Sequence, residues 1–174
     1  MKYLNACAFV VSLATVAACG SSDSPAAPSG NATRTFTATL RPSEEVPPVT
    51  GAESAGSGTA TITLIATNDA SGNLSSATVT FAVNLTGFPA GTPINIAHIH
   101  QAAAGQSGNV VVSTSVAPGE VNLTNGSGSF SRSGIAVTPD IATQLMSNPA
   151  GFYFNVHSTL NPGGVARGQL IRVQ

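Results

Sequence analysis

Short runs in which apolar or β-branched residues alternate with polar ones follow one another along most of the chain. Successive side chains of a β-strand point to opposite faces, so a period of two is typical of strands with one buried face. Turn-forming residues separate the runs, as at positions 68–73. The pattern predicts strands at Thr35–Leu40, Gly58–Thr67, Leu74–Leu85, Ile94–Gln101, Asn109–Val116, Gly128–Ser133, Phe152–Thr159 and Arg167–Val173.

One segment carries helical signals instead. Thr138 is a good N-cap, Pro139 suits the first helical position, Asp140 falls in the first turn, and Pro149 follows the end. These signals predict a short helix over 139–147. Seven or eight strands with one helix predict an all-β fold, an antiparallel Greek-key sandwich or barrel.

The chain has very little charge. Charged residues make up 7% of it, and its single lysine is Lys2. Nucleic-acid binding draws on clustered Lys and Arg side chains that displace counterions. We therefore expect no nucleic-acid partner.

The N-terminus has the features of a targeting segment. Lys2 precedes an apolar run at Leu4–Ala18, which has the length of a signal h-region. The stretch Val16-Ala17-Ala18-Cys19 resembles the lipobox of bacterial lipoproteins, in which the cysteine is lipidated after cleavage. A plain secretory signal cleaved near Ala18 is the alternative.

This resemblance predicts a division of the chain into three parts. Residues 1–18 form a lipoprotein signal peptide, residues 19–33 form a flexible Ser/Pro/Ala/Gly tether, and residues 34–174 form the β domain. Lipid on Cys19 would make the membrane a partner and place the protein in the cell envelope, on the outer membrane or cell surface. Loss of Cys7 with the signal leaves the mature domain without a free thiol. Thiol catalysis and thiolate-held metal clusters are thereby excluded.

The three histidines of the chain are His98, His100 and His157. The first two are spaced i and i+2 on a predicted strand, so they share a face, and His157 lies on a second predicted strand. Imidazole suits transition metals, and these residues predict a site for one Cu or Zn ion. Alternatively the histidines are structural and hydrogen-bond the backbone, or Asn155 and Tyr153.

In the predicted strand 152–159, the apolar side chains stand at even positions. Tyr153, Asn155 and His157 therefore point to the opposite face, and Arg167 joins them if the last strand pairs with this one. Tyr153, Asn155 and Arg167 are thus the residues expected to surround a metal site. The structural alternative for Arg167 is an ion pair with a carboxylate such as Glu45 or Asp140.

The facing of the other two histidines is ambiguous. His98 and His100 share their parity with Ile94, an apolar residue of the same predicted strand. Either the histidines lie at the rim of the apolar face, or a β-bulge near Ala97 switches the sides.

Several stretches together resemble the CHRD domain family, first described in the developmental inhibitor chordin, over about Thr35 to Val173. They are Leu40 with Glu45-Val46-Pro47-Pro48, Ala97-His98-Ile99-His100 with Gly105 and Gly108, and Tyr153–Ser158 with Asn161–Leu170. The resemblance implies a compact β-rich extracytoplasmic domain and no established enzymatic activity. We therefore expect a lipid-anchored binding or structural module with an unknown protein or matrix ligand. No nucleophile elbow, phosphate loop or zinc-protease helix indicates an enzyme.

A fainter similarity leads to the metal-binding alternative. The His-x-His strand, the distant histidine and the Gly-Gly-Val-Ala-Arg-Gly stretch at 163–168 resemble the copper-site layout of Cu/Zn superoxide dismutases, which are also Greek-key barrels. That family uses four histidines on copper and further ligands on zinc, so a complete dinuclear site is not possible here. A mononuclear copper or zinc site with three histidines, an open position for water and Arg167 nearby to attract an anion remains possible.

Overall fold

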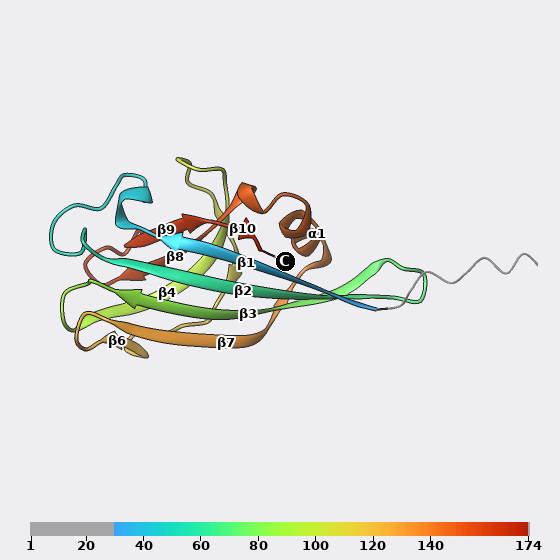
Figure 1. Cartoon of the computed structure of the whole chain (residues 1–174), viewed down its shortest axis with the longest axis horizontal. Coiled ribbons are helices and arrows are strands. Elements are labelled where there is room, and N and C mark those ends of the chain that lie inside the picture. The colour runs from blue at the N-terminus through green and yellow to red at the C-terminus, as the bar shows by residue number, and fades with distance from the viewer. Residues whose placement is uncertain (1–29, 174) are drawn as a thin grey trace, which may run out of the picture.

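The computed structural model describes residues 30–173, which fold into β-strands with one α-helix and two short 3-10 helices (Figure 1). The strands are β1 (Asn31–Leu40), β2 (Ser57–Asn68), β3 (Leu74–Thr86), β4 (Thr92–Gln101), β5 (Asn109–Ser113), β6 (Val121–Leu123), β7 (Gly128–Val137), β8 (Phe152–Ser158), β9 (Ala166–Gln169) and β10 (Ile171–Arg172). The helix is α1 (Pro139–Ser147), and the 3-10 helices are Pro42–Glu44 and Pro149–Gly151.

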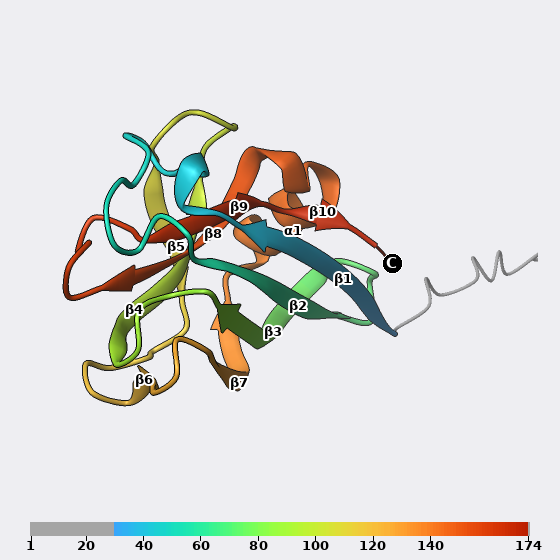
Figure 2. The same ribbon diagram turned by 60° about the vertical axis from the view of Figure 1, so that its left-hand side comes forward.

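The strands form two antiparallel sheets that face each other as a sandwich (Figure 2). Sheet A has the order β10-β1-β2-β3-β7, and sheet B has the order β5-β4-β8-β9, with β6 also paired to β4. An isolated bridge between Arg41 and Arg167 joins the end of β1 to β9. The predicted all-β fold is confirmed in its sandwich form, since the sheets do not close into a barrel.

The core lies between the two sheets. Phe36, Ile62 and Phe81 face inward from sheet A, and Ile99 and Phe154 face inward from sheet B, each with at most 1% of its surface exposed. The rings of Phe81 and Phe154 meet across the sandwich with their centroids 5.6 Å apart. Period-two alternation therefore has its expected physical cause, because one face of each strand packs into this core.

Helix α1 covers one end of the core and matches the predicted bounds. The side chain of its N-cap, Thr138, accepts a hydrogen bond from the Ile141 N–H, as the capping signal predicts. Ala142 and Leu145 bury the inner side of the helix. No helix in residues 30–173 is long and apolar enough to cross a membrane.

Some strand boundaries differ from the prediction. Strand β1 begins at Asn31 instead of Thr35, because its first residues pair with the far end of β2. The predicted last strand is two strands, since the chain passes from sheet B to sheet A at Leu170. Strand β6 was not predicted, because three residues are too short to show a period. The predicted signal peptide and Cys19 lie outside the described residues.

Candidate metal centre

A shift in register within β4 decides which way its histidines face. Opposite β8, the pairing moves out of step between Ile94 and Ile96. Ile94 is fully buried, Ile96 is 36% exposed, and Ala97 is buried again. His98 and His100 therefore point away from the core, on the outer face of sheet B. Of the two predicted alternatives the bulge is correct, and it lies at Asn95, between Ile94 and Ile96.

Pairing of β4, β8 and β9 gathers the other candidate residues on this same outer face. His98 lies opposite Asn155, which in turn lies opposite Arg167, and His100 lies opposite Tyr153. His157 is next along β8 on the same side. The prediction that Arg167 shares a face with His157 is confirmed.

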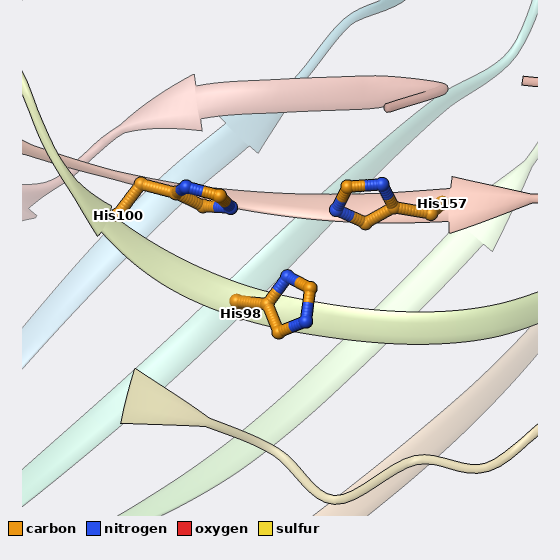
Figure 3. Close-up of side chains that lie close together, drawn as sticks. All are labelled: His98, His100 and His157. Carbon is orange, nitrogen blue, oxygen red and sulfur yellow. The ribbon is translucent and has the colours of Figure 1, made fainter. Parts of the chain in front are cut away.

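The three imidazole rings converge (Figure 3). His98 and His100 rise from β4 and His157 from β8, with ring centroids 5.0 to 6.3 Å apart. One ring nitrogen of each histidine lies within 4.8 Å of those of the other two. Nitrogens bonded to one tetrahedral Zn²⁺ ion lie about 3.3 Å apart, since each Zn–N bond is about 2.0 Å. Small rotations of the side chains would therefore bring the rings to bonding distance.

Two of the rings are held by backbone carbonyls. His100 Nδ1–H donates to Gly108 O, and His157 Nδ1–H donates to Pro162 O, both at 2.9 Å. In a neutral imidazole this leaves the lone pair on Nε2. Both Nε2 atoms, and Nδ1 of His98, are buried without a hydrogen-bond partner. Such outer hydrogen bonds typically orient the histidines of metal sites.

Electrostatics keep the cluster ready to bind a cation. Burial, together with the neighbouring His157 and His100, lowers the pKa of His98 to about 4. Burial also lowers the pKa of His157, against the opposing effect of its bond to Pro162. Both rings are therefore neutral at pH 7, which is the form that binds metal.

The residues predicted around the site form a stack beside it. The Tyr153 ring is parallel to that of His100 at a centroid distance of 4.8 Å, and the Arg167 guanidinium lies 4.6 Å from the Tyr153 centroid. Arg167 also donates to the backbone carbonyls of Glu44 and Gln106. These residues lie in the segments between β1 and β2 and between β4 and β5, which are the two covering loops of this face. Its predicted carboxylate partner is present, since Arg167 Nε is 3.9 Å from Glu45 Oε2.

Glu45 is the functional neighbour that the sequence reasoning did not assign to the site. The residue is 6% exposed, and its carboxylate accepts a hydrogen bond from Asn155 Nδ2 at 3.4 Å. Burial raises the pKa of Glu45 to about 7, although Arg167 and Asn155 both favour the ionised form. Two signals were available in the sequence, its candidate pairing with Arg167 and its place in the stretch Glu45-Val46-Pro47-Pro48.

Comparison with known families decides the classification. The CHRD domain matches residues 36–170, a range that includes all three histidines, Glu45 and both covering loops. The chain belongs to the CHRD domain family. No curated protein and no solved structure matches it. The similarity of this CHRD domain to the dismutases therefore rests on the sequence features alone.

Proposed function

We propose that this CHRD domain binds one transition-metal ion, copper or zinc, through His98, His100 and His157. The observation that carries the proposal is the convergence of three buried imidazole nitrogens, none of which has a hydrogen-bond partner. Leaving a buried polar atom unpaired costs about 1–3 kcal/mol. Three such atoms facing one another therefore lower the free energy of unfolding unless a shared ligand pairs with them.

The way the rings are held supports a metal more than a structural role. Structural histidines would use both ring nitrogens in hydrogen bonds within the protein. Here His100 and His157 use Nδ1 for that purpose and turn Nε2 toward the cluster. The imidazole donor set favours copper or zinc over calcium or magnesium, which prefer oxygen ligands.

The proposed location rests on the sequence alone and belongs to the same proposal. The lipobox-like stretch ending in Cys19 supports a lipid-anchored protein of the cell envelope. The β domain would then display its metal site outside the cytoplasm.

Metal uptake by purified protein tests the proposal. We expect one Cu²⁺ or Zn²⁺ per chain by titration calorimetry and elemental analysis. Free ion at 100 times the dissociation constant should then raise the free energy of unfolding by about 2.7 kcal/mol. H98Q, H100Q and H157Q should each abolish stoichiometric uptake, and no other histidine in the chain can replace them.

S113A is the matched control, because Ser113 is an exposed residue directly opposite His98. It should bind metal as the natural protein does. Uptake that persists in all three histidine variants would contradict the proposal. So would a natural protein that takes up no metal, and the domain would then be a binding module for a protein or matrix ligand with structural histidines.

A further inference from the structure

The unpartnered atoms of this site include two that a metal bound by histidines does not explain. Within residues 30–173, the buried side-chain nitrogens and oxygens without a hydrogen-bond partner belong to the three histidines, Asn155 and Arg167. All five residues lie on the outer face of sheet B. The two remaining atoms are Asn155 Oδ1 and Arg167 Nη2.

Asn155 lies beside the histidine cluster. In the register of β4 and β8 it lies directly opposite His98, and along β8 it is two residues from His157. Directly opposite residues of an antiparallel pair have Cβ atoms about 5 Å apart. Asn155 is therefore a direct neighbour of the histidines on the same face of β4 and β8.

The orientation of the Asn155 amide is set from its other side. Its Nδ2 donates to Glu45 Oε1, so its Oδ1 points away from that carboxylate. Gly164 makes this contact possible, because a Cβ at Gly164 would lie 2.6 Å from Glu45 Oε2 and 2.7 Å from Asn155 Nδ2. Asn155 is 2% exposed, so bulk water does not satisfy Oδ1. A buried amide oxygen held in this way can only accept a hydrogen bond.

We infer that Asn155 Oδ1 accepts a hydrogen bond from a small protic ligand, water or hydroxide, in the fourth coordination position of the metal. The inference rests on the proposed function and adds its ligand class. An amide oxygen is a poor ligand for copper or zinc beside three imidazoles, so Asn155 acts on the bound ligand and not on the ion. The same oxygen lone pair repels an aprotic anion at that position. The site therefore selects water or hydroxide over aprotic anions such as azide.

Azide binding to the copper-loaded protein tests this inference. In Asn155→Leu the side chain keeps its approximate volume but loses the acceptor. We expect one Cu²⁺ per chain as before, and an azide affinity about tenfold higher than in the natural protein, measured by the azide-to-copper absorption band and by electron paramagnetic resonance.

Ser113→Ala is the matched control in this experiment also, because Ser113 is exposed and lies opposite His98. S113A should leave the azide affinity unchanged.

The outcomes separate the two proposals. Absence of copper in the natural protein overturns the proposed function. One copper per chain with unchanged azide affinity in N155L overturns the inference about Asn155. Loss of copper from N155L also overturns it, because Asn155 would then be a metal ligand itself.

Discussion

The three histidines are held in two different ways. His100 and His157 are each fixed by a hydrogen bond to a loop carbonyl, and His100 also stacks on Tyr153. His98 has its neighbouring rings as contacts and a buried, unpartnered Nδ1. His98 is therefore the ring with most freedom to move toward an ion. Its pKa is lowered to about 4, mainly by burial.

The low pKa of His98 makes the metal-free domain sensitive to acid. The folded protein holds this pKa near 4, whereas the unfolded chain protonates near the usual 6.5. Between these values the unfolded state binds more protons, so the free energy of unfolding falls as the pH falls from 6.5 to 4. Urea unfolding followed by circular dichroism should show that H98Q reduces this loss. If the free energy of unfolding changed equally with pH in the natural protein and in H98Q, the low pKa of His98 would be contradicted.

Glu45 makes the free energy of unfolding change with pH in the opposite direction. Its folded pKa is about 7 against 4.5 for the ordinary carboxyl, so the folded state binds more protons between these values. Its contribution to stability is complete below pH 4.5 and is lost as the pH rises toward 7. E45Q therefore serves as the matched control, since it should remove this slope and leave that of His98 in place.

For single residues, the alternating pattern predicted which way the side chains of β8 face and left the facing of the β4 histidines undecided. The even apolar positions of β8 placed Tyr153, Asn155 and His157 on one face, as the structure confirms. The parity of β4 did not decide the facing of His98 and His100, because the extra residue of a bulge reverses parity without changing residue type.

Two loops complete the site and link it to the strands. The segment between β4 and β5 supplies the Gly108 carbonyl to His100, and the segment between β8 and β9 supplies the Pro162 carbonyl to His157. Each loop therefore orients a histidine from the strand that precedes it. A change in loop position should lower metal affinity without removing a ligand.

Gly108→Ala tests the first loop. A Cβ at Gly108 would lie 2.0 Å from the Gln101 carbonyl oxygen, so the loop must move away from β4. We expect metal affinity to fall by about 10–100-fold, as for other changes behind a ligating histidine. Gly163→Ala is the control, because a Cβ at Gly163 meets no atom within 4 Å. Titration calorimetry that gives the two variants the same affinity would show that the loop does not position His100.

Among the helices and strands, the sequence predicted those whose bounds depend on neighbouring residues along the chain. Helix α1 was predicted within its observed bounds because Thr138 and Pro139 act locally. The division of the last strand at Leu170 was not predicted, because it depends on which strand each half meets. Residues before Leu170 pair with β8, and those after it pair with β1. A continuous alternating pattern carries no signal of that change of partner.

In the whole molecule, the core and the candidate site lie on opposite faces of sheet B. Phe154 and Ile99 pack toward sheet A, while Asn155 and His98 point outward beneath the covering loops. Loss of metal should therefore leave the sandwich folded, since the core makes no use of the site. This separation also allows the histidine variants above to be compared as folded proteins.

The predicted lipid anchor is far from the proposed metal ligands in the sequence. Cys19 precedes the first strand by a Ser/Pro/Ala/Gly-rich segment, and β1 begins at Asn31. In Cys19→Ala the site of lipidation is lost, so the protein should move from the detergent-extractable membrane fraction to the soluble fraction of its host. Its metal stoichiometry should stay at one ion per chain, because every proposed ligand lies between His98 and His157. Cell fractionation with immunoblotting measures the first effect and elemental analysis the second. If natural protein and variant were equally soluble, the lipid anchor would be refuted and the metal site would be unaffected, since a single chain can be exported and bind metal without an anchor.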